Sequence, residues 1–303
     1  MRPQTSVEIC GIKFKNPVIA ASGTFSFGIE HAEYTDLNRI GGIAVKGLTL
    51  EPKKGNPPPR IAETPSGILN SVGLQNPGID FFIKHQLPRL TEYDTRIIIN
   101  INGNTEDEYC MLAEKLRDKP VDLLELNISC PNVREGGMAF GTDPRMVYNV
   151  TKSVKAHAGQ PVLVKLTPNV TDIKEIAIAV EEGGGDGISL INTVLGMAID
   201  ARSRKPILAN VVGGLSGPAI KPIALRMVWE VSNVVTIPIV GMGGIVTGED
   251  AVEFLLAGAT AVGVGTANLI TPDACIDIVH QLEEYMINNG IKDINELIGG
   301  LIV

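Results

Sequence analysis

The chain has 303 residues, of which 44% are hydrophobic and 20% are charged, which is the composition of an ordinary globular protein. Its net charge of −8 argues against a nucleic-acid or anionic-membrane partner. No apolar run reaches membrane-spanning length and the N-terminus lacks an apolar signal core, so we expect a cytoplasmic protein.

The chain opens with VEICGIKFKNP, which is predicted to form a short hairpin. After it, apolar and β-branched runs recur with helical segments between them. Such runs are typical of parallel strands, and eight in one series predict a (β/α)8 TIM barrel, with a doubly wound sheet as the main alternative. The runs cover 17–22, 41–47, 97–103, 123–130, 161–166, 187–193, 237–245 and 261–267.

The segments between the runs divide into helices and longer loops. Residues 105–118 and 171–184 carry capping Thr or Asp residues and spaced apolar positions, which predict amphipathic helices. The loops 51–78 and 131–143 follow the second and fourth strands, so both should lie over the C-terminal mouth, where such barrels place their active sites. The hairpin should lie below the barrel. No break in composition suggests a second domain.

The predicted strand ends are unusually polar for a parallel barrel. Buried amide and ammonium groups cost a few kcal/mol or more when unpaired, so we expect a polar and anionic ligand at the mouth. Any one of these residues could instead be a hydrogen-bonded structural group. The set is Lys46, Asn100, Asn127, Cys130, Lys165, Asn192 and Thr193.

Glycine-rich turns follow the last two predicted strands, at 241–248 and 263–268. In barrels of this type, loops at these positions often bind phosphate through backbone N–H groups, although packing turns are the alternative. Neither stretch is a G-x-G-x-x-G sequence before a Rossmann helix, so no nicotinamide-dinucleotide site is predicted. The loop ILNSVGLQNPG, 68–78, is either a plain turn cluster or a set of amides that bind a small heterocycle.

The motif NISCPNV places Cys130 at the end of the fourth predicted strand. A free cysteine is often a buried small hydrophobe, but a thiol with an ordinary pKa of about 8.5 can also serve as a base. The other cysteines are scattered without a C-x-x-C pair, so we expect no metal site and a reducing compartment. The four histidines fall outside the strand ends and are not candidates.

With NISCPNV, NSVGLQNPG, GGIAVKGLT and GMGGI in the same order, the sequence resembles the dihydroorotate dehydrogenases of pyrimidine biosynthesis over nearly its whole length. The resemblance implies a single FMN-binding TIM-barrel domain over 1–303. It implies that Cys130, as in class 1 of the family, takes a proton from C5 of dihydroorotate while hydride passes from C6 to FMN, giving orotate.

The resemblance also implies binding residues. The implied substrate contacts are Lys46, Asn70, Ser71, Val72, Gly73, Leu74, Asn127, Asn192 and Thr193. The implied contacts to FMN, one per chain, are Ser22, Lys46, Gly47, Asn100, Asn127, Lys165, Ile191, Gly217, Gly243, Gly244, Gly265 and Thr266. Lys46 could face the orotate carboxylate, and Lys165 would stabilise the negative charge of the reduced ring.

The loop VREGGMAFGTDP is similar to that of the class 1B catalytic subunit. That similarity implies a partner subunit carrying FAD and a 2Fe-2S cluster, which passes electrons to NAD⁺, and a homodimer of this chain within a heterotetramer. The scattered cysteines and missing dinucleotide motif agree with a separate electron-transfer subunit, but they also fit a class 1A homodimer that reduces fumarate. Class 2 is less similar because its serine base and membrane-associating extension are missing.

Two other functions are alternatives to this one. A phosphate-substrate barrel lyase would use Lys165 as a Schiff-base nucleophile and would be colourless, whereas a flavoprotein is yellow. A non-enzymatic binding subunit would leave the thiol and the lysines of the mouth without a purpose.

Overall fold

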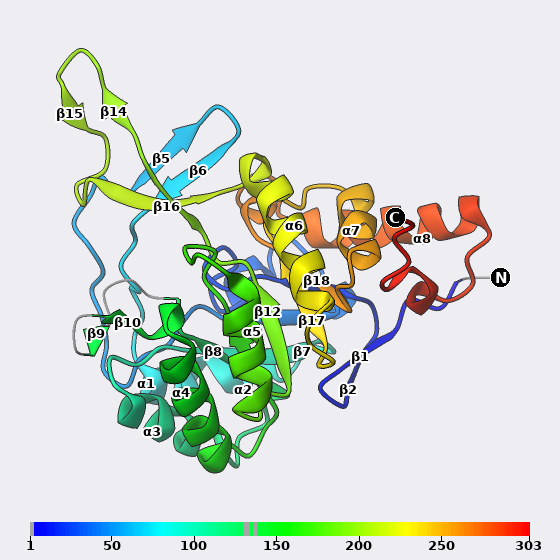
Figure 1. The fold of residues 1–303 in the computed structure, drawn as a ribbon, viewed down its shortest axis with the longest axis horizontal. Coiled ribbons are helices and arrows are strands. Elements are labelled where there is room, and N and C mark those ends of the chain that lie inside the picture. Colours follow the sequence, from blue (N-terminus) through cyan, green and yellow to red (C-terminus); the bar gives the residue numbers. More distant parts are fainter. Residues whose placement is uncertain (1–2, 130–133, 136–137) are drawn as a thin grey trace.

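The computed structural model describes residues 3–129, 134–135 and 138–303. Within these ranges, eight parallel strands close into a barrel in the order β11-β12-β17-β18-β3-β4-β7-β8, which confirms the predicted fold class (Figure 1). Each predicted run coincides with one of these strands, although β7 begins one residue before its run. Their bounds are β3 Val18–Ala20, β4 Gly42–Ala44, β7 Arg96–Ile101, β8 Leu123–Asn127, β11 Val162–Lys165, β12 Gly187–Leu190, β17 Ile239–Met242 and β18 Ala261–Val264.

The helices surround the barrel and bury one side against it. Both predicted amphipathic helices are present as α3, Glu106–Leu116, and α5, Ile173–Glu182. The Thr105 and Asp172 side chains accept backbone N–H groups of the first turns, which is why these helices begin where they do. The other α-helices are α1 Ile79–Phe81, α2 Leu87–Leu90, α4 Pro144–His157, α6 Lys221–Ser232, α7 Gly248–Leu256 and α8 Ala274–Asn289.

Short helical turns complete the connections. They are η1 Ile29–His31, η2 Leu37–Arg39, η3 Phe82–Gln86, η4 Phe140–Thr142, η5 Pro218–Ile220, η6 Thr266–Leu269 and η7 Ile294–Leu297. In the described part of the chain, no helix is both long and apolar enough to cross a bilayer.

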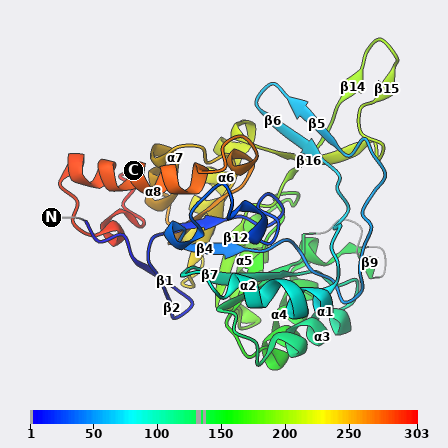
Figure 2. The same cartoon turned by 180° about the vertical axis from the view of Figure 1, so that it is seen from behind.

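The opening segment forms the predicted hairpin, with β1 Val7–Ile9 paired to β2 Ile12–Phe14. It covers the N-terminal end of the barrel, because Nε of Arg96, the first residue of β7, donates to the Lys13 carbonyl at 2.8 Å. The hairpin and the large antiparallel sheet described next lie toward opposite ends of the barrel (Figure 2).

The antiparallel sheet at the mouth was not predicted. The loop 51–78 contains β5 Ile61–Thr64 and β6 Gly67–Asn70, and these pair with β16 Val212–Ser216 and β13 Val194–Met197 in the order β13-β16-β6-β5. A further hairpin, β14 Ile199–Asp200 with β15 Lys205–Pro206, extends from it (Figure 1). No strands were predicted within these elaborated loops, because the strands are short and gain their partners from distant parts of the chain.

The loop after β8 is described in part. Its β9, Arg134–Glu135, pairs with β10, Met138–Ala139, and η4 then leads into α4. Residues 130–133 and 136–137 lie outside the described residues, and Cys130 is among them.

Candidate active site at the barrel mouth

Amide side chains gather inside the barrel near its C-terminal end. Asn100 comes from β7 and is 1% exposed, and its Oδ1 accepts from Asn102 Nδ2 at 2.8 Å. Asn127 ends the neighbouring β8, and its Nδ2 lies 3.5 Å from the same Asn100 oxygen. Asn102 Oδ1 is buried without a hydrogen-bond partner among the described residues. The cluster therefore keeps a free acceptor that a ligand with N–H groups can use.

A buried carboxylate, Glu125 of β8, lies beside this cluster and was missed by the sequence prediction. Its Oε2 accepts from Asn100 Nδ2 at 2.5 Å and from Ser22 Oγ at 3.3 Å, and its Oε1 accepts from Ser189 Oγ at 2.8 Å. The Lys165 ammonium at the end of β11 lies 3.8 Å from Oε2. A single acid within the apolar run LLELN was the signal, because Glu125 and Asn127 are two residues apart and so share the inner face of the strand.

The predicted glycine turns meet at one side of the mouth. Gly243 and Gly244 follow β17 with φ of 132° and 79°, and a Cβ on Gly244 would lie 2.9 Å from the Gly217 carbonyl oxygen. Thr266 Oγ1 donates to Ser216 Oγ at 2.8 Å, next to Gly217. A Cβ on Gly265 would lie 4.0 Å from Ala21 Cβ and Thr24 Oγ1, which is ordinary van der Waals contact. Converging glycine turns suit a phosphate group.

Lys46 is a cation of this region that forms no ion pair among the described residues. It follows β4, it is half-buried, and no carboxylate of the described residues lies within 4 Å of its ammonium. Burial, and secondarily the nearby Arg60 guanidinium, lowers its pKa from the usual lysine value. An anionic ligand would relieve both effects. The adjacent Gly47 has no room for a side chain, since a Cβ there would lie 2.4 Å from Asn102 Nδ2.

The predicted substrate segment 70–74 crosses from the upper sheet to the mouth. Ser71 N donates to the Arg60 carbonyl at 2.8 Å, and its hydroxyl is buried without a partner among the described residues. Val72 and Leu74 use their carbonyl groups to accept from Asn56 and Asn76, and Gly73 lies against the Asn56 side chain. The segment is thus held in place chiefly by hydrogen bonds to its backbone groups.

The segment after β12 reaches the same place. Ile191 follows Leu190 across a cis peptide bond, and Asn192 N donates to the Leu166 carbonyl at 2.9 Å. Asn70 Nδ2 donates to the Gly214 carbonyl at 3.3 Å, and a Cβ on Gly214 would lie 2.0 Å from Thr193 Oγ1. Strand β16 therefore brings the two predicted substrate segments together.

Cys130, the predicted base, lies outside the described residues, so its placement stays a prediction. Its neighbour Ser129 donates from Oγ to the Lys165 carbonyl at 2.9 Å.

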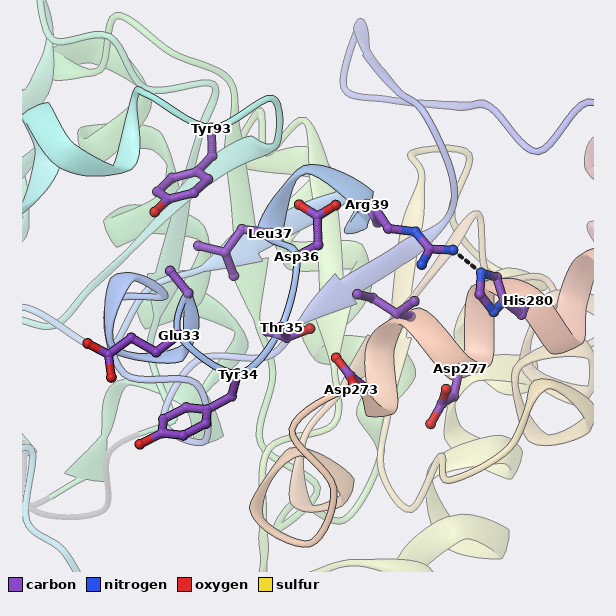
Figure 3. A pocket seen from close by; sticks show the side chains of 12 residues that line it. Glu33, Tyr34, Thr35, Asp36, Leu37, Arg39, Tyr93, Asp273, Asp277 and His280 are labelled. Carbon is purple, nitrogen blue, oxygen red and sulfur yellow. Dashed lines mark hydrogen bonds between the residues drawn. The ribbon is translucent and has the colours of Figure 1, made fainter.

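A surface hollow of ≈ 570 Å³ lies elsewhere, between the η1–η2 segment and α8 (Figure 3). It contains none of the predicted site residues. Its lining includes Glu33, Asp36, Asp273 and Asp277, and the Arg39 guanidinium contacts His280. Four carboxylates disfavour an anionic ligand, so the barrel mouth remains the candidate site. The described residues contain no group of three or more His, Cys, Asp or Glu side chains that could hold a metal ion.

Comparison with known proteins gives consistent matches. A family model described as dihydroorotate dehydrogenase matches residues 4–286. The dihydroorotate dehydrogenase B (NAD(+)) catalytic subunit of Alkaliphilus metalliredigens is 63% identical, covering 97% of this chain and 98% of that protein. The protein with the same description from Geobacter metallireducens is 57% identical, covering 100% and 99%.

A solved structure of the Eimeria tenella dihydroorotate dehydrogenase in complex with ferulenol has the same fold. Its TM-score is 0.83 at 24% identity, and the match covers 98% of this chain and 88% of that one.

Proposed function

The chain belongs to the dihydroorotate dehydrogenase family and is an enzyme of its NAD⁺-dependent B type, and we propose that its barrel mouth oxidises dihydroorotate to orotate with FMN as the bound cofactor. The whole chain would act as a single FMN-binding domain, which agrees with its one continuous hydrophobic cluster. The observation that carries the substrate assignment is Lys46, a half-buried ammonium with no carboxylate within 4 Å among the described residues.

The residues present fit FMN. The turns at Gly217, Gly243, Gly244 and Gly265 would receive the phosphate, with Thr266 beside them, and Gly217, Gly243 and Gly244 have positive φ angles that side chains rarely adopt. The polar groups Ser22, Lys46, Asn100, Asn127 and Lys165, with Gly47 and Ile191, would hold the ring. When bound, FMN supplies the acceptor for the hydride that leaves C6 of the substrate.

The substrate would lie between the segments 70–74 and 192–193. Lys46 would bind its carboxylate, while the amides of Asn70, Asn127 and Asn192 would donate to and accept from the ring, and Thr193 and Ser71 would contribute hydroxyl groups. Asn192 and Thr193 already form a fixed unit, since Thr193 N donates to Asn192 Oδ1 at 2.8 Å. Side chains that are already fixed in place can bind and orient the substrate without rearranging, and this lowers the barrier to the reaction.

Cys130 is proposed as the general base that takes the proton from C5. Support comes from the NISCPNV motif and from the family membership of the chain. The alternative phosphate-substrate lyase would require Lys165 as a nucleophile, but Lys165 is 6% exposed, and its ammonium donates to Ser22 Oγ and lies 3.8 Å from Glu125. Lys165 thus lies against a carboxylate rather than in the apolar pocket, or beside the second cation, that activates a Schiff-base lysine.

Electron export is proposed to use a partner subunit that carries FAD and a 2Fe-2S cluster, with this chain as a homodimer inside a heterotetramer. The similar proteins are described as catalytic subunits of the B (NAD(+)) type, which favours this arrangement over a fumarate-reducing class 1A homodimer.

The test is purification of the chain followed by a dye-coupled assay. A yellow protein with bound FMN that oxidises dihydroorotate with an artificial dye, but does not reduce NAD⁺ alone, supports the proposal. A colourless protein without this activity after incubation with FMN contradicts it. Rapid fumarate reduction would move the chain to class 1A.

A further inference from the structure

Glu125 is buried more deeply than any other acid at the mouth and contacts three of the proposed flavin-binding residues. Its carboxylate is 2% exposed, and it accepts from Ser22 and Asn100 and lies 3.8 Å from the Lys165 ammonium. Lys165 in turn donates to Ser22 Oγ at 3.2 Å. The carboxylate therefore hydrogen-bonds to two of these residues, Ser22 and Asn100, and forms an ion pair with the third, Lys165.

Hydrogen-bond donors surround the Glu125 carboxylate. Both of its oxygens accept hydrogen bonds, from Ser189 on one side and from Ser22 and Asn100 on the other, and the nearest ionisable group is a cation. Such a buried ion pair contributes little net stability because removing both charges from water is costly. Its contribution must then be sought in what it does to the mouth.

We propose that Glu125 is a positioning residue of the flavin site, which fixes the Ser22, Asn100 and Lys165 side chains and offsets the charge of Lys165. This inference rests on the proposed function, because it takes those three side chains to be flavin contacts. Two-electron reduction adds negative charge to a bound flavin, so a nearby ammonium favours the reduced form and a nearby carboxylate disfavours it. Glu125 therefore keeps the flavin harder to reduce than Lys165 alone would make it.

The decisive measurement is the reduction potential of bound FMN in Glu125→Gln. The glutamine keeps the size of the side chain and removes its charge. We expect the equilibrium between oxidised and reduced flavin, measured against a reference dye, to shift at least about tenfold toward the reduced form, which corresponds to about +30 mV for a two-electron couple. An unchanged or lowered potential overturns the inference.

A matched control is Asp186→Asn. Asp186 also pairs with a lysine, Lys155, at 2.6 Å, but it directly precedes β12 at the opposite end of the barrel. The control should leave the potential of bound FMN unchanged. An equal shift in both variants would show a general loss of packing and would also overturn the inference.

Glu125→Gln leaves Lys165 buried without its anion and so could prevent folding. In that case a second variant, Glu125→Asp, tests the inference. Glu125→Asp keeps the charge, so the equilibrium between oxidised and reduced flavin should stay within threefold of that in the wild type. A tenfold shift toward the reduced flavin in Glu125→Asp overturns the inference. Failure of the proposed function is a separate result, because it would show as a wild-type chain that binds no FMN.

Discussion

Two carboxylate–lysine pairs lie at opposite ends of the same barrel and differ in almost every physical respect. At the N-terminal end, Asp186 and Lys155 are 2.6 Å apart, and their side chains are 32% and 29% exposed. Toward the mouth, Glu125 and Lys165 are 3.8 Å apart, and their side chains are 2% and 6% exposed. The first pair has the shorter contact and the better access to water, and the second is longer and almost dry.

The difference in exposure to water indicates that the Asp186–Lys155 pair stabilises the fold, whereas the Glu125–Lys165 pair serves the function of the mouth. Asp186 also accepts from Val162 N at 2.6 Å, so it fixes the start of β11 while water still solvates it. The Glu125–Lys165 pair loses the favourable free energy of hydration, and its hydrogen bonds within the protein compensate for only part of that loss. Charges retained under those conditions point to a ligand at the mouth, whereas the lower end of the barrel has the features of a structural cap.

Replacing Cys130, the proposed base, and Cys10 of the lower hairpin should give the largest contrast. Cys130→Ala should slow flavin reduction by dihydroorotate about 10²–10⁴-fold with FMN still bound, because it removes the proposed base. Cys130→Ser should keep some activity with its pH optimum moved upward, since a hydroxyl is a weaker acid than a thiol. Stopped-flow absorbance of the flavin measures both.

Cys10 is the matched control for this pair of variants. It lies in the lower hairpin turn, where burial and then the Asp186 charge raise the pKa of its thiol to about 12, so it cannot act as a base near neutral pH. Cys10→Ala should retain wild-type flavin reduction and lose about 1 kcal/mol of stability. Flavin reduction by Cys130→Ala at the wild-type rate would remove that residue from the mechanism.

Replacing Lys46 near the mouth and Lys155 at the N-terminal end of the barrel should give a smaller difference, which is measured as KM for dihydroorotate. Lys46→Met should raise KM for dihydroorotate roughly 10- to 100-fold, because a hydrogen bond to a charged group contributes about 1.5–3 kcal/mol. Lys155→Met should leave KM unchanged. Equal KM values for the wild type and Lys46→Met would refute the assignment of the substrate carboxylate to Lys46.

The pH dependence of KM sharpens the same point. The pKa of Lys46 is lowered in the folded protein, chiefly by desolvation and then by Arg60, so its ammonium is lost at a lower pH than that of an ordinary lysine. KM should not change with pH while Lys46 carries its ammonium. As pH increases, KM should begin to rise at a pH below the usual pKa of lysine. Steady-state kinetics of wild type and Lys46→Met should show this rise in the wild type only.

The smallest effect should come from Asp186→Asn. Asp186→Asn removes a partly exposed ion pair but keeps an amide oxygen that can accept from Val162 N, so it should lower the free energy of unfolding by no more than about 1 kcal/mol, with substrate and flavin affinities unchanged. Chemical denaturation and FMN titration measure the two quantities. A marked loss of FMN affinity would mean that the two ends of the barrel are coupled.

The barrel was predictable because its strands are buried on both faces. β7 is buried at every position from Ile97 to Ile101, so it reads as a continuous apolar run. The sheet over the mouth was not predictable, since β5 and β13 alternate between intermediate and exposed positions and Asn70 contacts Gly214 across 144 residues. Short, half-exposed strands with distant partners leave little trace in a local pattern.

The site was predictable where strand ends carried isolated polar residues, such as Asn127 and Lys165. Glu125 was within reach of the same reasoning, as a lone acid in an apolar strand, but its partners Ser22 and Ser189 come from other strands or loops and only the fold brings them together. The roles of the binding residues and of Cys130 stay predictions.

The central claim is that this chain alone removes both hydrogens from dihydroorotate and needs a partner only to export the electrons. Anaerobic mixing of dihydroorotate with the FMN-loaded chain, without any acceptor, tests it in a single turnover. The account predicts that the visible flavin absorbance bleaches while one orotate forms per FMN, and that adding NAD⁺ does not restore the colour. A flavin that stays oxidised under saturating dihydroorotate would contradict the account.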